Sequence, residues 1–318
     1  MASTAVKKVN AAGKKHTWYS AALIDLKKYR YIYLMSIPVV IYYILFHYLP
    51  MYGAIISFKN FSPGLGIWGS PWVGFQNFED FFTGPYFFRI FRNTVLINFY
   101  QLIFNFPAPI LLALLLNEIT SNKFKRVVQT VSYMPHFISI MVICGLIIDF
   151  TAKDGIINDL VAFFGVERQS MLLNPGLFQP IYVLSGIWQE IGWGSIIYLA
   201  ALSSIDTEQY EAARIDGATR WQQMWNITLP GIMPTIIIML ILRIGSMMNL
   251  GFEKIILLYN PSIYETADVI SSYVYRKGLL EFSYSYSSAV GLFNSVINFV
   301  LLLSANKISR KVNEVSLW

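Results

Sequence analysis

Long apolar runs separated by short polar segments make up most of this 318-residue chain. A helix of about 20 apolar residues crosses the roughly 30 Å hydrocarbon core of a bilayer. Five runs of that size contain no Asp, Glu, Lys or Arg, and a sixth is equally apolar except for Glu190. The pattern therefore predicts six membrane-spanning helices, at 31–58, 93–117, 127–148, 180–203, 221–242 and 282–306.

Other architectures agree less well with this pattern. A membrane β-barrel needs apolar and polar residues in alternation, which the runs lack, and lipid otherwise tolerates only helices. Six buried helices of a large soluble protein would each need a polar outer face, and segments such as "PTIIIMLIL" and "LIFNFPAPILLALLL" have none. We expect an all-α polytopic membrane protein.

Composition supports the membrane class and one domain. The chain is 55% hydrophobic and 13% charged, whereas soluble domains carry about 25% charged residues. Six spans leave only loops and two tails, so we expect a transmembrane domain at 31–306 between tails at 1–30 and 307–318.

Basic residues indicate the orientation. Lys and Arg are concentrated in both tails and in the loops after the second and fourth predicted spans. The positive-inside rule then places both termini in the cytoplasm. The net charge of +6 is mainly a topology signal, and nucleic-acid binding by the basic N-terminal tail is the weaker alternative. The first apolar run follows thirty mostly polar residues and is too long for a cleavable signal peptide, so we interpret it as a retained anchor.

A polar loop at 204–230 stands out between two apolar runs. Asp206 can cap a helix, and Gln209 three residues later completes a pattern similar to a capping box. We expect a helix over 207–216 that ends at Gly217.

A second start signal follows in the same loop. Thr219 and Gln222 repeat the capping pattern, which predicts a second short helix reaching toward Pro230. Two helices joined at a glycine would form a bent, exposed knob. Small residues at 212 and 213 would let a partner approach closely, with charged neighbours beside them.

The spacing within this loop resembles the EAA motif of permease subunits in binding-protein-dependent ABC importers. Glu-Ala-Ala is followed after three residues by Gly217, and after nine more by Ile-Thr-Leu-Pro at 227–230. The resemblance implies a type I importer permease fold in which this loop inserts into a cleft on a cytoplasmic ATPase subunit. The ATPase-coupling residues that it implies are Glu211, Ala212, Ala213, Asp216, Gly217, Leu229 and Pro230.

Other segments extend the resemblance over roughly residues 30 to 310. "WVGFQNFEDFF", "RNTVLIN" and "YMPHFIS" are similar to sugar-type permeases. "GIWQEIGWGSIIYLAALSSIDTEQYEAARIDGATR" and "GFEKIILLYNPSIYETADVISSYVYRKGL" are similar to the Gram-positive subfamily for complex oligosaccharides and polysaccharides, including aldouronate-like systems. The implied partners are a second permease chain, two ATPase subunits, an extracellular sugar-binding lipoprotein and an oligosaccharide, in a bacterial plasma membrane.

Sequence features expected of an enzyme are missing. The chain contains no Gly-x-x-x-x-Gly-Lys-Ser/Thr phosphate-binding loop, so ATP and Mg²⁺ would bind on the partner ATPases. Cys144 is the only cysteine, which excludes an internal disulfide and a Cys-pair metal site. His16, His47 and His136 have no ligand spacing, and we interpret His136 as packed or hydrogen-bonded. We expect no catalysis, metal or cofactor on this chain.

Charges inside the predicted spans point to a transport path. Glu190 and Arg243 lie at matching depths in the fourth and fifth spans, where a lone charge costs about 2.5–3.5 kcal/mol on insertion scales. They either pair with each other, in which case the pair could serve only to fix helix packing, or border a water-filled sugar cavity. Polar and aromatic residues near this depth are further candidates, although Trp often marks the interface and Asn often bonds a neighbouring helix. These candidates are Trp188, Gln189, Trp193, Asn249, Asn294 and Asn298.

Two regions outside the predicted spans could dock the binding protein. The aromatic-rich segment 58–92 could pack against the outer interface or receive that protein, and 252–288 is a second candidate. A secondary transporter or channel that needs no ATPase is the alternative function, and a membrane-embedded enzyme is a weaker one. The EAA loop favours the importer subunit over both.

Overall fold

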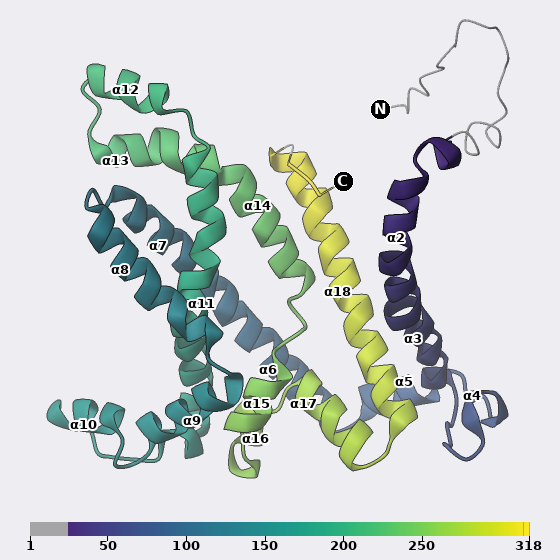
Figure 1. Ribbon diagram of the computed structural model, residues 1–318. Helices are drawn as coiled ribbons and strands as arrows, with labels where there is room; N and C mark the ends of the chain where they lie inside the picture. Colours follow the sequence, from purple (N-terminus) through teal and green to yellow (C-terminus); the bar gives the residue numbers. More distant parts are fainter. Residues whose placement is uncertain (1–24, 314, 318) are drawn as a thin grey trace, which may run out of the picture. The chain divides into compact units, whose positions relative to one another are not determined.

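The computed structural model describes residues 25–313 and 315–317 and is helical through most of them (Figure 1). Most of the predicted N-terminal tail, with His16, lies outside the described residues. Within them no strand forms, and the only β-type pairing is an isolated bridge between Lys59 and Trp72. The all-α prediction is confirmed. Contacts divide the chain into two units, residues 1–55 and 56–318, which are considered separately.

The described part of the first unit is helical and is mainly apolar from Tyr31 onward. It comprises α2 (Arg30–Tyr43), the π-helical turn η1 (Ile44–Tyr48) and α3 (Leu49–Met51), and it leads into the 3-10 helix η2 (Tyr52–Phe58). The helical segment Arg30–Phe58 is long enough and apolar enough to cross a membrane. No side chain of α2 is buried within its own unit.

The second predicted span forms in the second unit as an interrupted helix over Phe87–Glu118. It consists of α6 (Phe87–Tyr100), the π-helical turn η3 (Gln101–Asn105) and α7 (Pro107–Glu118). Pro107 supplies no N–H for the regular helical ladder, so the preceding turn widens. The consequence is a local bulge at mid-helix that carries Gln101 and Asn105.

The third apolar run does not form the single helix expected over 127–148. The run and the residues around it form α8 (Asn122–Tyr133), η4 (Met134–Phe137), α9 (Ile140–Thr151) and α10 (Ile156–Phe163). The two parts meet at an angle of 101°. Pro135 disfavours a continuous helix, and Ser139 caps a new one by accepting a bond from the Val142 N–H at 3.4 Å.

The remaining long helices agree closely with the predicted spans. They are α11 (Pro175–Ser203), the continuous helix Arg220–Gly245 and α18 (Tyr284–Asn313). With 29 residues, α11 is about 43 Å long, but it is less apolar than the four helices that meet a membrane-span criterion among the described residues. The total of six spans therefore stays a prediction. Beyond the end of α18 expected at 306, the helix continues, and Val315–Leu317 fold back through bonds to Ser309 and Asn306.

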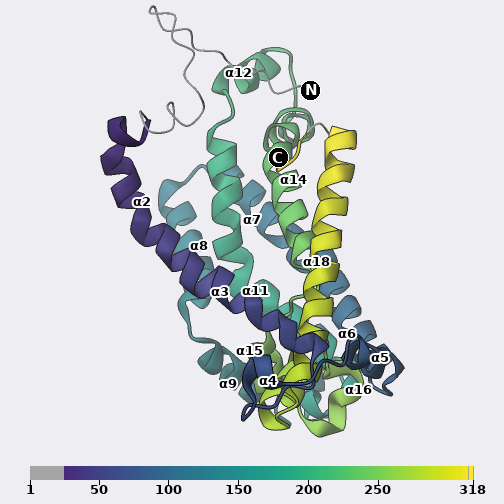
Figure 2. The same cartoon turned by 90° about the vertical axis from the view of Figure 1, so that its right-hand side faces the viewer.

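Short helices cover one end of the second unit. They are α4 (Gly66–Gly69), α5 (Gln76–Thr83), η5 (Met171–Leu173), α15 (Phe252–Leu258), η7 (Pro261–Ile263), α16 (Tyr264–Ala267), α17 (Ile270–Tyr275) and η8 (Arg276–Leu280). In both Figure 1 and Figure 2, α9, α15 and α16 lie at the end opposite to α12 and the C-terminal end of α18. The polar 204–230 loop and the predicted extracellular segments thus lie at opposite ends of this unit.

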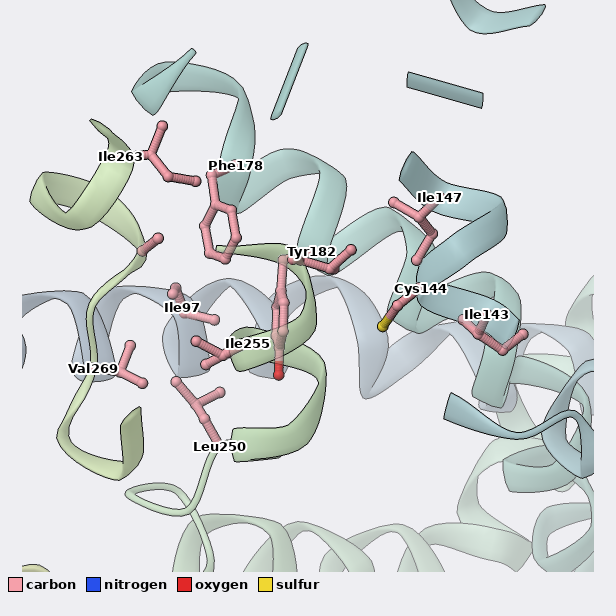
Figure 3. Close-up of a cluster of buried hydrophobic side chains, with 12 residues drawn as sticks. Ile97, Ile143, Cys144, Ile147, Phe178, Tyr182, Leu250, Ile255, Ile263 and Val269 are labelled. Atoms are coloured by element: carbon pink, nitrogen blue, oxygen red, sulfur yellow. The ribbon is translucent and has the colours of Figure 1, made fainter. Parts of the chain in front are cut away.

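Helix α11 is at the centre of the packing and contacts α7, α8 and α14. A side chain at Gly192 would place its Cβ 2.0 Å from the Ser132 carbonyl oxygen, so glycine permits this close approach to α8. An apolar cluster joins α11 to α6, α9 and α15 through buried residues such as Phe178, Ile143 and Ile255 (Figure 3).

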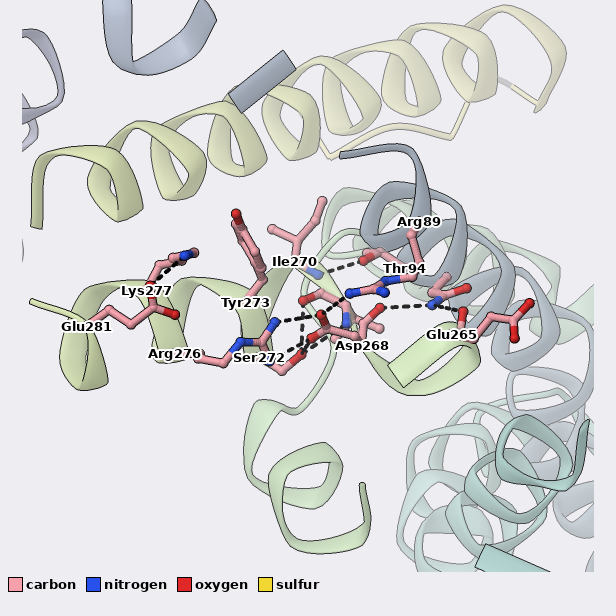
Figure 4. Close-up of polar contacts among 12 residues, drawn as sticks. Arg89, Thr94, Glu265, Asp268, Ile270, Ser272, Tyr273, Arg276, Lys277 and Glu281 are labelled. Atoms are coloured by element: carbon pink, nitrogen blue, oxygen red, sulfur yellow. Dashed lines mark hydrogen bonds and ion pairs between the residues drawn. The ribbon is translucent and has the colours of Figure 1, made fainter. Parts of the chain in front are cut away.

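A polar cluster fixes α16 and α17 against α6 (Figure 4). The fully buried Asp268 carboxylate accepts bonds from Arg276 at 2.7 and 3.2 Å, from Ser272 at 2.9 Å and from Arg89 at 3.4 Å. Burial lowers the pKa of Arg276, but the bonds and charge of Asp268 outweigh it, so the pKa lies above its ordinary value. This end of the unit is therefore held by a buried ionic network.

Candidate functional site

The 204–230 loop begins as its sequence predicts. Helix α12 (Thr207–Ile215) starts after Asp206, whose carboxylate accepts from the Glu208 N–H at 3.0 Å. The reciprocal side-chain bond expected of Gln209 is not present among the described contacts. Gly217 has a φ of +77°, a conformation that residues with a Cβ adopt at a cost.

The end of α12 is a Schellman motif. The Ala218 N–H donates to the Ala213 carbonyl at 2.8 Å, and the Gly217 N–H donates to the Arg214 carbonyl at 3.1 Å. These two bonds require the left-handed conformation at the glycine. The predicted bend at Gly217 is therefore present, with α12 ending one residue earlier than expected.

The second half of the loop differs from the prediction of a separate short helix. Thr219 and Gln222 form the predicted capping box at the start of α13 (Arg220–Gln223). The helix then continues through the π-helical turn η6 (Met224–Thr228) into α14 (Leu229–Gly245) without a non-helical residue. Leu229 and Pro230 lie inside this continuous helix, and because Pro230 supplies no N–H to the helical ladder, the preceding turn widens. The coupling motif thus extends directly into a predicted span.

Internal bonds attach α12 to this continuous helix. The hydroxyl groups of Tyr210 and Thr228 are 3.0 Å apart, and Gln223 donates to the Ala218 carbonyl at 2.8 Å. Gln223 and Thr228 are buried. The loop is therefore fixed to α14 at several points along its length.

The outer face of the loop is accessible. Glu211, Ala212, Asp216 and Gly217 are exposed, and Ala213 is half-buried. Three large apolar residues that the sequence analysis did not single out are also exposed, namely Ile215 at 87%, Trp221 at 65% and Trp225 at 57%. Apolar side chains on an exposed polar loop are typical of a protein-binding surface. In the sequence, the signal for these exposed residues was the presence of large apolar side chains within a charged segment.

A second candidate site is a cavity of about 630 Å³ among η3, α7, α11, α14 and α15. Its size is within the range of about 300–1,000 Å³ found for small-molecule pockets. The polar and charged lining includes Gln101, Asn105, Gln189, Glu190, Arg243, Asn249, Glu253 and Lys254. Four of these, Gln189, Glu190, Arg243 and Asn249, were sequence candidates.

Glu190 and Arg243 both line the cavity but do not pair with each other. The Glu190 carboxylate is 3.0 Å from His136 Nδ1, and Arg243 donates to the Gln101 carboxamide oxygen at 2.5 Å. His136 also stacks on Trp193, with ring centroids 4.5 Å apart. Of the two alternatives, this arrangement corresponds to charges beside a cavity, and His136 is packed and hydrogen-bonded as expected.

The other candidates divide between the cavity and the packing between helices. Asn294 donates to the Asn249 side chain at 2.9 Å, next to the cavity. Asn298 is buried and accepts from the Met248 N–H at 2.9 Å, which secures the turn after α14. Trp188 and Trp193 are each 44% exposed and do not line the cavity.

Lys254, the least exposed charged group of the cavity, was not predicted from the sequence. Its side chain is on α15 and the residue is 7% exposed, with Nζ 5.1 Å from the centroid of the Tyr182 ring. Among the described residues it has no carboxylate partner. Its position beside Glu253 in the otherwise apolar stretch "GFEKIILL" was a signal, but that pattern alone does not show that the side chain is buried.

Comparison with known proteins gives consistent matches. The family model described as "Binding-protein-dependent transport system inner membrane component" matches residues 105–314. Protein LplB of Bacillus subtilis is 47% identical over 98% of this chain and 96% of its own length. The polygalacturonan/rhamnogalacturonan transport system permease protein YteP of the same organism is 46% identical, over 93% and 92% respectively.

Solved structures extend this similarity to three dimensions. A chain of a bacterial ABC transporter involved in importing the acidic polysaccharide alginate superposes with a TM-score of 0.85. It is 43% identical, and the match covers 92% of this chain and 99% of that one. A second structure of a bacterial alginate ABC transporter contains an alginate pentasaccharide-bound periplasmic protein, and its matching chain is 42% identical with the same TM-score.

Proposed function

The chain belongs to the family of binding-protein-dependent transport system inner membrane components, and from this premise we propose that it carries oligosaccharides or polysaccharide fragments into a bacterial cell. It is a multi-pass permease subunit of an ABC importer. ATP and Mg²⁺ bind on two separate ATPase subunits, and a second, different permease chain completes the pathway. Both termini are cytoplasmic in this arrangement.

The observation that carries the proposal is the fixed, bent loop with an exposed apolar tip. Ile215 projects beside Asp216 and Gly217, so an ATPase cleft can bury an apolar side chain next to polar ones. Glu211 supplies a polar contact within the cleft, and Ala212 and Ala213 permit close approach. Leu229 and Pro230 connect this surface to the span.

Motion at the loop reaches the cavity through one helix. Arg220 and Arg243 belong to the same helix, Arg220–Gly245, which separates them by about 35 Å. The Tyr210–Thr228 bond makes α12 move with that helix. Closure of the ATPases would displace the loop and, with it, the wall of the cavity that carries Arg243.

The substrate class is supported by the cavity and by the relatives. Carboxamides and charged groups from several helices can bond saccharide hydroxyl groups, and Gln189, Glu190, Arg243 and Asn249 are the residues proposed for the path. The names of two relatives refer to polysaccharides. An extracellular sugar-binding lipoprotein would deliver the substrate to the segments 58–92 and 252–288.

The test is a single charge placed at the loop tip. Ile215→Asp should abolish co-purification of the ATPase subunits and ATP-dependent uptake, because it would bury an unpaired carboxylate in the interface. Val166→Asp is the matched control, since Val166 is an exposed apolar residue in the segment after α10. Normal ATPase association by Ile215→Asp would contradict the docking role. Uptake that persists without any ATPase subunit would instead indicate a secondary transporter or channel.

A further inference from the structure

We propose that the cavity recognises a carboxylate on the saccharide and that Lys254, on α15, is the residue that binds it. This inference rests on the proposed function, because it specifies the chemical class of the imported oligosaccharide. It also assigns a specificity role to a residue outside both the coupling motif and the intramembrane charges identified in the sequence.

The state of Lys254 is the first observation. The residue is 7% exposed, yet it lines the cavity and has neither a hydrogen-bond acceptor nor an ion-pair partner among the described residues. Its Nζ lies 5.1 Å from the Tyr182 ring centroid, and the Glu190 carboxylate acts on it electrostatically without forming an ion pair with it. Buried charges are normally paired. A carboxylate that arrives with the substrate would supply the missing partner.

The other charges around the cavity leave room for an anion. Glu190 bonds His136 at 3.0 Å, and Glu253 is exposed, and neither carboxylate forms an ion pair with Lys254. Arg243 bonds the uncharged Gln101 and pairs with no carboxylate among the described residues. Two cations are thus available to an incoming anion, and Lys254 is the more buried of them.

A neutral acceptor next to this charge suits the rest of a sugar. The buried carboxamide oxygen of Asn105 has no hydrogen-bond partner, and the residue lines the same cavity. Rotation of the Asn105 side chain would bring that oxygen to the cavity, where a saccharide hydroxyl could donate to it while a ring carboxylate accepts from Lys254. The solved structure of an importer for an acidic polysaccharide, at 43% identity, agrees with this combination of groups.

The experiment uses the complete importer with its binding protein in proteoliposomes. ATP-dependent uptake is measured for trigalacturonate and for its carboxyl-reduced trigalactoside, at concentrations that saturate the binding protein. Lys254→Met should reduce uptake of the acidic trimer at least about tenfold, because a hydrogen bond to a charged group is lost. Lys254→Arg should restore most of that uptake. Lys153→Met removes an exposed lysine and is the matched control.

The outcomes separate this inference from the proposed function. Absence of ATP-dependent uptake of either trimer by the wild-type complex would overturn the proposed function itself. Uptake of the acidic trimer by Lys254→Met at the wild-type rate would overturn only the carboxylate assignment. If the Lys254→Met complex fails to assemble, the test is the rise in melting temperature that each trimer causes in the wild-type complex without binding protein. Stronger stabilisation by the acidic trimer than by the neutral one supports the proposal, and equal stabilisation refutes it.

Discussion

Replacing Gly217 by valine isolates the contribution of the bend to coupling. A Cβ at this position would meet nothing within 4 Å, so the variant introduces no clash with neighbouring groups. The cost comes only from the φ of +77°, which is about 1–3 kcal/mol for a β-branched residue in the left-handed region. The strain could relax only by breaking the two Schellman bonds that Gly217 and Ala218 donate.

The expected consequence follows from that magnitude. A penalty of about 2 kcal/mol lowers the population of the docking conformation roughly 30-fold relative to its alternatives. ATP hydrolysed per sugar imported should therefore rise in proteoliposomes, while the melting temperature of the transmembrane bundle changes little. Gly217→Asn is the control, because asparagine tolerates this conformation better. Coupled uptake by Gly217→Val at the wild-type ratio would refute the role of the bend.

Three further substitutions test other parts of the structure. Asp268→Asn should destabilise the folded protein by about 3 kcal/mol because it leaves Arg276 without its buried counter-ion, and an unchanged melting temperature in detergent would contradict this. Exchange of Glu190 and Arg243 should fail to restore uptake lost in the single charge-neutralised variants, since each bonds a different residue; recovery in the exchange variant would show that they pair. Asn298→Leu should lower stability by about 1–3 kcal/mol through the loss of its bond to a buried N–H, measured as a lower melting temperature with intact ATPase binding.

Local signals made much of the helical architecture predictable. The ends of α12 and the start of α13 depend on contacts within about six residues, so Asp206, Gly217 and Thr219 marked them in the sequence. The apolar runs predicted where the long helices lie, because a helix that crosses the hydrocarbon core of a bilayer consists mainly of apolar residues. The same rule could not show that the run 127–148 is broken near Ser139, since neither side of the break contains an Asp, Glu, Lys or Arg within that run.

Charge and hydrogen-bond partners in the cavity were decided only by the tertiary structure. Glu190 bonds His136, which is 54 positions away in the chain, instead of Arg243. Lys254 is buried because α15 packs beside α9 and α17, and nothing within its own helix requires that. The sequence by itself determined a helical membrane protein with a bent polar loop, because those features arise from local backbone bonding and from the hydrophobic effect along each segment. Which polar groups meet, and which remain unpaired, depends on how distant helices pack, and that is a property of the folded chain as a whole.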